Sequence, residues 1–296
     1  MNEESAILAA IAAHPAEDTP RLAYADWLDD HAGDSADPPG ARLRAEFIRV
    51  QCEIKTLEDR TSTELQGYAD LYRRQDAILT RHRRELLGPL GDDITDQEVV
   101  FDRGFVAELR LDATRYMRHA NAIATFQPLP DIRVWDGGAW LAHLLEPSGR
   151  LELVTVLEMQ SPRRAEPTTL NPAEMLWLNE VSPRLRLRTL NLEGCQIGFW
   201  GLPPLVQNNP FPTLTHLDLS GNELPDAAVE ELVNSALWPR LKYLVLGANP
   251  ISDEGAFTLA DARPTTLEYL NLKVTAIGRE GQQRLLRRKG WKVDLF

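Results

Sequence analysis

The hydrophobic positions between residues 187 and 277 recur with a fixed spacing. Four segments begin at Leu187, Leu214, Leu241 and Leu267, so that successive segments start 27, 27 and 26 residues apart. Leucine occupies the first, fourth and sixth positions of every segment. Positions four and six are two residues apart, and residues with this spacing point to the same side of a strand. The pattern predicts one short strand in each segment, with its leucines facing a shared core.

The remaining positions of these segments are also regular. The eleventh position is aliphatic and the ninth is small or polar: Ile197, Leu224, Ile251 and Ile277, and Cys195, Asn222, Asn249 and Thr275. A polar side chain at the ninth position can hydrogen-bond turn backbone that adjacent coils would otherwise leave unpaired. The whole pattern resembles the leucine-rich repeat, L-x-x-L-x-L-x-x-N/C-x-L. Its period of 26–27 residues is similar to that of the ribonuclease-inhibitor type.

Helical stretches are predicted between the strands, at 225–237, 252–262 and 279–289. The first two open with Pro-Asp and Ser-Asp, which favour a helix N-terminus. The final segment, GWKVDLF, predicts a closing strand. The resemblance implies an α/β fold: a solenoid with a parallel sheet on its concave side and helices on its convex side.

Weaker copies of the pattern extend upstream. They begin at Val106, Leu129 and Val154, with irregular spacings of 23, 25 and then 33 residues to Leu187. The longest gap contains residues 161–172, which are rich in Pro, Thr and Arg and predict an inserted loop. Such a loop is either functional or a tolerated insertion, and the sequence leaves both alternatives open.

A hairpin is predicted at about 98–111, immediately before the repeats. Two apolar strands flank Asp102-Arg103-Gly104, which suits a tight turn. The first coil of a solenoid needs a cover for its exposed core. We therefore expect the hairpin, together with the N-terminal domain, to cap the array.

The N-terminal residues predict a helical domain over 1–90, followed by a repeat domain over 91–296 that includes the hairpin. Helices are expected at about 3–13, 18–31, 41–59 and 64–87. Residues 3–51 resemble the short bacterial repeat-companion domain, although the DSADPPGARL insert before Arg44 departs from it. The match rests on Pro20, Arg21, Leu22, Ala25, Asp26, Trp27, Leu28, Ala45, Glu46, Phe47 and Gln51. This resemblance implies a bacterial origin and supplies no activity.

Charge and composition narrow the function classes. The net charge of the 296 residues is −12, and residues 1–100 hold 21 acidic against 11 basic side chains. This argues against a nucleic-acid partner, which requires a basic surface. Two distant cysteines form neither a disulfide framework nor a zinc pattern. Without a signal peptide or an apolar run of about 18 residues, we expect a cytoplasmic protein that does not enter the membrane.

The stretch RLAYADWLDDHAGD (21–34) raises the question of a metal or hydrolytic site in the helical domain. On a helix Asp26, Asp29 and Asp30 share one face, but His31 points away from it. No H-x-x-x-H or H-x-E pattern supplies further ligands. A solvated acidic face with Trp27 packed inward is the favoured interpretation, and the metal or hydrolytic site is the less favoured alternative.

Two further features point to structural roles. The stretch RHRRE (81–85), with Arg73 and Arg74, forms a basic run that could pair with the acidic second helix, and local ion pairs are favoured over a nucleic-acid role. Cys195 and Cys52 are expected to be buried and inert. Since no common catalytic or phosphate-binding motif occurs, we expect no cofactor and no enzymatic activity.

The concave face of the solenoid supplies the candidate binding residues. Third- and fifth-position side chains point away from the core, and seventh-position ones lie at the edge of the sheet. The candidates for contact with a protein partner are Arg110, Arg133, Trp135, Glu158, Asn191, His216, Asp218, Tyr243, Tyr269 and Asn271. Tyr243 and Tyr269, beside His216, stand out because aromatic residues dominate interface hot spots. The alternative is that these rings only cover the sheet.

These observations favour a non-catalytic protein–protein interaction module. A second hypothesis, suggested by the ribonuclease-inhibitor resemblance, is a regulator or inhibitor of a partner enzyme.

Overall fold

A computed structural model describes residues 2–58, 65–160, 168–208, 210–263 and 266–296 of the chain. The chain divides into two compact units. Unit 1 comprises Met1–Arg110 and His119–Asp131, and unit 2 comprises Leu111–Arg118 and Ile132–Phe296. No helix among the described residues has both the length and the apolar character needed to cross a bilayer.

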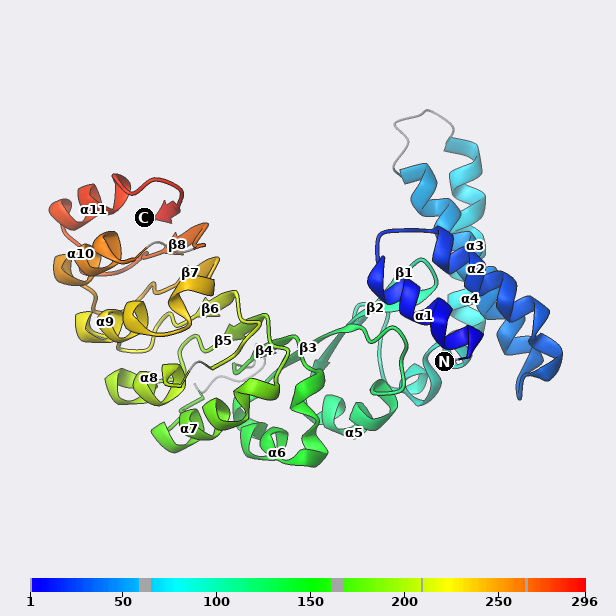
Figure 1. Ribbon diagram of the computed structural model, residues 1–296, viewed down its shortest axis with the longest axis horizontal. Coiled ribbons are helices and arrows are strands. Elements are labelled where there is room, and N and C mark those ends of the chain that lie inside the picture. The colour runs from blue at the N-terminus through cyan, green and yellow to red at the C-terminus, as the bar shows by residue number, and fades with distance from the viewer. Residues whose placement is uncertain (1, 59–64, 161–167, 209, 264–265) are drawn as a thin grey trace. The chain divides into compact units, whose positions relative to one another are not determined.

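Unit 1 contains the predicted helices, drawn in blue to cyan in Figure 1. They are α1 (Glu3–Ala13), α2 (Thr19–Asp30), α3 (Pro38–Glu58) and α4 (Leu65–Leu87), with short 3₁₀ turns at Ala32–Asp34 and Gly88–Asp92. Helix α3 packs against both α2 and α4. It begins earlier than the sequence predicts because Pro38 and Pro39 fill its first positions, where a missing N–H group costs nothing.

The predicted hairpin is also present in unit 1. Strand β1 (Val99–Asp102) pairs antiparallel with β2 (Phe105–Asp112). The turn residues Arg103 and Gly104 have φ values of 48° and 84°, which match the twist of a two-residue hairpin. Gly104 N–H donates to Gln51 Oε1 of α3, and Phe105 enters the helical core. The hairpin tip is therefore built into the helical unit.

Two expectations about the first domain stay predictions. The first is the domain boundary at residue 90, because it concerns which segments can fold on their own. The covering of the first coil by the hairpin and helices is the other.

The strands of unit 2 follow one another in parallel. They are β3 (Asp131–Trp135), β4 (Val156–Glu158), β5 (Thr189–Asn191), β6 (His216–Asp218), β7 (Tyr243–Val245), β8 (Tyr269–Asn271) and β9 (Lys292–Asp294). Each pairs with the next in chain order. The strands that the leucine pattern predicts are thus confirmed, and so is the closing strand β9.

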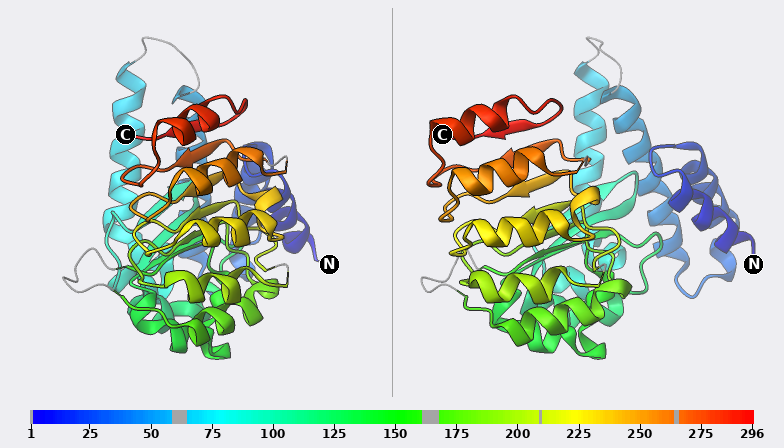
Figure 2. Two further views of the ribbon diagram at one scale, coloured as in Figure 1. Left: turned by 90° about the vertical axis from the view of Figure 1, so that its left-hand side faces the viewer. Right: turned by 60° about the vertical axis from the view of Figure 1, so that its left-hand side comes forward.

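Helices lie on the outer side of these strands (Figures 1 and 2). They are α5 (Ala113–Ile123), α6 (Leu141–Leu145), α7 (Pro172–Val181), α8 (Gly198–Val206), α9 (Asp226–Asn234), α10 (Asp253–Asp261) and α11 (Arg279–Leu286). Short 3₁₀ turns occur at Gly138–Trp140, Pro147–Gly149, Leu151–Leu153, Ser182–Arg184 and Trp238–Arg240. The order of strand inside and helix outside is that of a leucine-rich-repeat solenoid.

The periodic leucines form the core of unit 2. Fourth-position leucines are at most 2% exposed and sixth-position leucines at most 1%: Leu190, Leu217, Leu244 and Leu270, and Leu192, Leu219, Leu246 and Leu272. Burying one leucine side chain stabilises a fold by about 1.5–3 kcal/mol. Because every coil contributes leucines at the same two positions, each coil completes the core of its neighbour.

The ninth-position asparagines join adjacent coils by hydrogen bonds. Asn249 is 3% exposed; its Oδ1 accepts the N–H groups of Asn222 and Leu224, both at 3.0 Å. Its Nδ2 donates to the carbonyl groups of Leu219 and Leu246, both at 2.9 Å. One side chain thereby pairs backbone groups of two coils, as the sequence predicts for this position.

The helices are also tied together, through their N-termini. The Asp226 carboxylate of α9 accepts the Ser252 and Gly255 N–H groups at the start of α10, at 2.8 and 3.0 Å. Asp253 of α10 does the same for Gly278 and Gly281 at the start of α11, at 2.7 and 3.1 Å. A carboxylate at a helix N-terminus satisfies free N–H groups and opposes the helix dipole.

The weaker upstream pattern is aligned differently from the sequence prediction. Arg133 lies opposite Val156, and Val134 lies opposite Leu157. The alignment that starts at Leu129 is therefore wrong by two residues. Arg133 stands in the third column rather than the fifth, and Trp135 in the fifth rather than the seventh. A shift of two residues keeps every side chain on its own face, so the apolar pattern alone does not detect it.

The predicted loop at 161–172 falls largely outside the described residues, which exclude 161–167. Of the remainder, the Thr169 hydroxyl donates to Gln196 Oε1 at 3.0 Å, and Pro172 begins α7.

Replacing Gly104 with alanine is expected to destabilise unit 1. The residue has φ of 84°, and an added Cβ would lie 2.6 Å from the Ile48 Cα of α3. We expect a loss of about 2 kcal/mol in urea denaturation followed by circular dichroism. Gly33→Ala is the control, because no atom lies within 4 Å of its added Cβ. Equal stability of the two variants would contradict the docking of the turn on α3.

Replacing Asn249 with alanine is expected to lower the free energy of unfolding by about 3 kcal/mol, because several buried backbone groups lose their partners. Chemical denaturation of the purified chain measures the change. Asn234→Ala removes the same atoms from an exposed position at the end of α9 and is expected to change little. A small effect at Asn249 would show that the leucines alone hold the coils.

Candidate functional site

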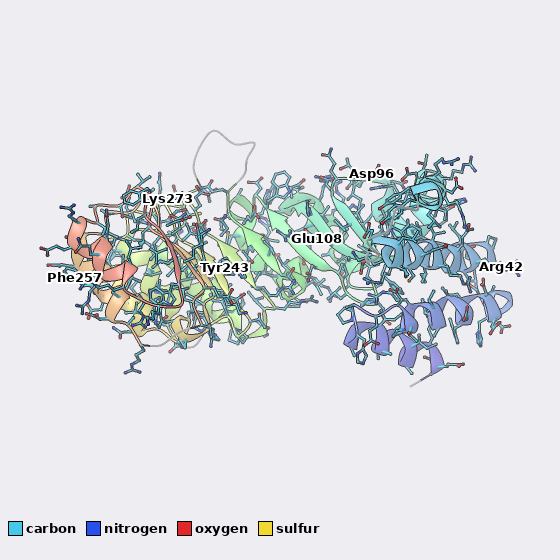
Figure 3. The ribbon with its side chains drawn as sticks, turned by 90° about the horizontal axis from the view of Figure 1, so that it is seen from above. Arg42, Asp96, Glu108, Tyr243, Phe257 and Lys273 are labelled. Carbon is cyan, nitrogen blue, oxygen red and sulfur yellow. The ribbon has the colours of Figure 1, made fainter. Side chains whose placement is uncertain are left out.

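Three rings stack across neighbouring strands on the inner face of unit 2. His216 of β6 lies opposite Tyr243 of β7, which lies opposite Tyr269 of β8. The His216 and Tyr243 rings are stacked, with centroids 4.3 Å apart and planes 8° from parallel. The Tyr243 and Tyr269 rings are tilted by 36°, at 6.0 Å. We call these residues the aromatic column; Tyr243 is labelled in Figure 3. The sequence placed these rings side by side correctly.

The far end of the aromatic column is anchored. The Tyr269 hydroxyl donates to Asp294 Oδ2 of β9 at 2.8 Å and lies 3.4 Å from Asn271 Nδ2. The Lys292 ammonium group lies 5.7 Å from the centre of the Tyr269 ring, within cation–π range. The hydrogen bond to Asp294 raises the pKa of the Tyr269 hydroxyl, so it stays protonated. In the middle of the column Tyr243 remains 38% exposed.

His216 carries the basic group of the aromatic column. Partial burial lowers its pKa, the nearby Lys242 and Arg188 charges lower it further, and Glu268 acts in the opposite direction. The Thr215 hydroxyl lies 2.8 Å from Nδ1. A neutral, hydrogen-bonded imidazole can lie flat on Tyr243 without a charge to solvate.

Three fifth-position candidates hydrogen-bond their own backbone, which the sequence did not reveal. Side-chain oxygens of Asn191, Asp218 and Asn271 accept the N–H of the residue two positions on, at 2.8, 2.9 and 2.9 Å. This is the local turn that Asn and Asp side chains favour. The three side chains end their strands and stay half-exposed. They are therefore part of the inner face, but their identity is also explained by the backbone.

The remaining candidates fall at the start of the array. Arg133 is exposed and near enough to Glu158 to lower the pKa of its carboxyl, although burial has the larger effect and the net pKa is raised. Trp135 is half-buried. Arg110 belongs to unit 1, where its Nε donates to Glu108 at 2.7 Å. Arg110 is thus not placed with the aromatic column.

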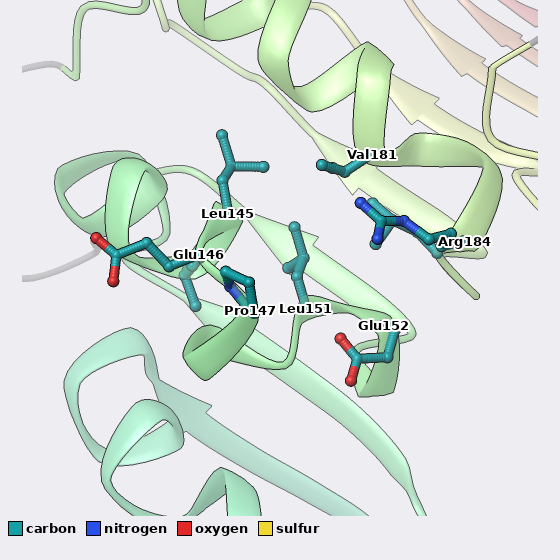
Figure 4. Close-up of a pocket in the computed structure, with 9 residues that line it drawn as sticks. Leu145, Glu146, Pro147, Leu151, Glu152, Val181 and Arg184 are labelled. Atoms are coloured by element: carbon teal, nitrogen blue, oxygen red, sulfur yellow. The ribbon is translucent and has the colours of Figure 1, made fainter.

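A small cavity of about 300 Å³ lies between the connections that follow α6 and α7. Figure 4 shows Leu145, Leu151 and Val181 around it, with Glu152 and Arg184 nearby. Its lining is mainly aliphatic, and it lies apart from the candidate residues. Sequence reasoning did not single out this cavity.

The acidic stretch of α2 forms ion pairs within unit 1. Asp26 and Asp29 pair with Arg49 of α3, at 2.8 and 2.7 Å. His31 stacks on Trp27 at 4.5 Å, and its Nδ1 lies 2.9 Å from the Trp27 carbonyl oxygen. Trp27 packs against the helical core, as predicted. In the parts of the chain that the structure describes, no three His, Cys, Asp or Glu side chains are grouped to hold a metal ion.

The basic run of α4 forms local ion pairs, as predicted, but their partners do not lie on α2. Arg74 pairs with Glu46 of α3 at 3.1 Å, and Arg83 and Arg84 pair with Asp96 and Asp92. The reason is the helix order, because α3 packs against both α2 and α4. Arg49 of α3 takes the acidic partners on α2 instead.

Both cysteines are buried, Cys52 at 3% exposure and Cys195 at 0%. Burial raises the pKa of each thiol to about 12. At neutral pH both are protonated and therefore poor nucleophiles.

Comparison with known families supports the repeat assignment for part of the chain. Residues 212–233 and 240–260 each match the family model described as Leucine Rich repeat. The two matches contain β6 with most of α9, and β7 with most of α10. A search of the curated proteins finds no match. Leucine-rich repeats generally serve protein–protein interaction, and two rings of the aromatic column, His216 and Tyr243, lie within the matched segments.

We expect His216 to titrate below the ordinary histidine pKa of about 6.5. Since the folded pKa is lowered, the unfolded chain binds more protons between the two values, so stability rises as the pH increases through that window. NMR titration of the ring protons measures the pKa. His216→Gln should remove this part of the pH dependence; a midpoint above 6.5 would show that burial does not govern the ring.

Proposed function

We propose that the chain is a non-catalytic interaction module that binds a protein partner on the inner face of unit 2, with the aromatic column at the centre of contact. The observation that carries the proposal is the stack itself. Tyr243 is held between two rings and still presents more than a third of its surface to solvent.

Energetic reasoning supports this position for a binding hot spot. Aromatic side chains contribute much of the free energy of association because they bury a large area while immobilising few torsions. Rings already fixed by neighbours lose still less entropy on binding. The curved inner face of a solenoid is in addition the surface that most repeat proteins use.

We further propose that the protein is not an enzyme, that its repeats are of the ribonuclease-inhibitor type, and that it is a bacterial cytoplasmic protein. The protonated thiols and the hydrogen-bonded neutral imidazole supply no activated nucleophile, which supports a non-enzymatic role. The outer helices and the period of 26–27 residues favour the ribonuclease-inhibitor type of repeat. Two buried free thiols fit a reducing, cytoplasmic compartment. A bacterial source rests on the resemblance of residues 3–51 to the repeat-companion domain.

Tyr243→Ala combined with Tyr269→Ala is expected to weaken capture of the partner by at least about tenfold, because each buried aromatic hot spot contributes about 2 kcal/mol or more. The measurement is a quantitative pull-down from cells of the source organism, with captured proteins identified by mass spectrometry. Circular dichroism checks that the variant is folded.

Trp177→Ala combined with Trp200→Ala is the matched control. Both tryptophans are exposed, at 50% and 76%, on the outer helices α7 and α8. The control should capture the same proteins as the unmodified chain. If the tyrosine variant captures them equally well, while the tryptophan variant loses them, the inner face is not the binding surface.

A further inference from the structure

An open groove of about 610 Å³ lies beside the aromatic column, where the chain enters the strands. For each of the strands β5, β6 and β7, the groove is lined by the residue directly before the strand and by the residue three positions before it. Its charged residues are Arg186, Arg188, Arg240 and Lys242. We call it the basic groove. Among the described residues that line it, none is acidic.

The basic groove is unusual for this chain, whose net charge is −12. Glu268 borders it and pairs with Lys242 at 3.3 Å. The Arg240 guanidinium is held in place by donating to the carbonyl oxygens of Pro210 and Phe211, at 2.6 and 3.4 Å. Fixed cations on a shared wall attract a negatively charged ligand and hold its orientation.

The groove adjoins the aromatic column. Lys242 immediately precedes Tyr243, and Thr215, which also lines the groove, immediately precedes His216. The Thr215 hydroxyl contacts the His216 ring. The rest of the lining includes Pro212 and Pro239, so apolar surface lies between the cations. Charged groove residues and the rings of the aromatic column therefore lie next to each other.

We infer that the partner contributes an extended acidic peptide in which negatively charged residues alternate with aromatic or aliphatic ones. This inference rests on the proposed function and names the chemistry of the partner. Alternate side chains of an extended peptide point to opposite sides. One set can therefore meet Arg186, Arg188 and Lys242 while the other packs against Tyr243.

A nucleic acid fits this surface less well than a peptide. Binding through phosphates requires a broad basic surface, because affinity comes from counterion release along the strand. Here four cations line one groove of a chain whose net charge is −12. The apolar lining and adjacent rings match a peptide with apolar side chains.

The test uses the full chain and fluorescence anisotropy with three labelled probes: a ten-residue peptide of alternating Glu and Tyr, its Lys-Tyr counterpart, and a ten-nucleotide single-stranded DNA. The Glu-Tyr peptide is expected to bind at least about tenfold more tightly than either other probe. Its affinity should fall as NaCl rises from about 0.05 to 0.5 M, since salt screens exposed charges.

Arg188→Glu combined with Lys242→Glu should weaken binding of the Glu-Tyr peptide by at least about tenfold. The neutral pair Arg188→Gln and Lys242→Gln should give an intermediate loss, and it covers the case in which charge reversal disturbs folding. Arg287→Glu combined with Lys289→Glu is the control; it changes the net charge equally at exposed positions beyond α11 and should bind normally.

Equal binding of the two peptides, tighter binding of the DNA, or unchanged affinity in both the Glu and the Gln variants would overturn the inference. If the tyrosine variant still fails to capture its partner under any of these results, the proposed function stands and only the acidic character of the partner is wrong.

Discussion

The structure of unit 2 depends on hydrogen bonds that a few buried polar side chains make between coils. Leucine burial supplies most of the free energy but has no direction, since apolar contact tolerates small shifts. Asn222 and Asn249, at 0% and 3% exposure, each bind backbone groups of their own and a neighbouring coil. The bonds that cross between coils fix how far one coil lies from the next and in which register.

These hydrogen bonds between coils occur in two of the three coils that carry the aromatic column. The coils of Asn222 and Asn249 carry His216 and Tyr243. In the coil that carries Tyr269, Thr275 takes the ninth position, and its hydroxyl donates to Leu272 at 2.8 Å within that coil. Tyr269 is held instead by Asp294 of β9. Helix N-termini add a second set of links through Asp226 and Asp253. The rings are thus aligned by backbone that both sets of links hold in place, which would lower the entropic cost of binding the proposed partner.

Much of this arrangement follows from the sequence because its period is so regular. Two-residue spacing of leucines determines which side chains face outward, and the equal repeat length places Tyr243 beside Tyr269. The structure was harder to predict from the sequence where other interactions compete with the repeat pattern. Helix α8 contains Pro203 and Pro204, which oppose a helix, yet the coil geometry forms one there. The alignment of Arg133 was misjudged because a two-residue slip preserves the faces.

Parts of the proposed binding surface had no sequence signal of their own. The turn-forming role of Asn191 and its counterparts requires knowledge of where each strand ends. The cations of the basic groove come in two pairs, Arg186 with Arg188 and Arg240 with Lys242, from coils that are not adjacent in the chain, and each alone looks like an ordinary surface cation. Only the stacking of coils brings Arg188 and Lys242 to one groove beside the rings.

Site-specific photo-crosslinking tests the central claim most directly. Benzoylphenylalanine placed at Tyr243 of the full chain, irradiated in the presence of the captured partner, is expected to form a covalent adduct with it. The same group at Trp200, on the outer side, is expected to form none. Crosslinking from Trp200 without crosslinking from Tyr243 would contradict the account and assign binding to the helical side.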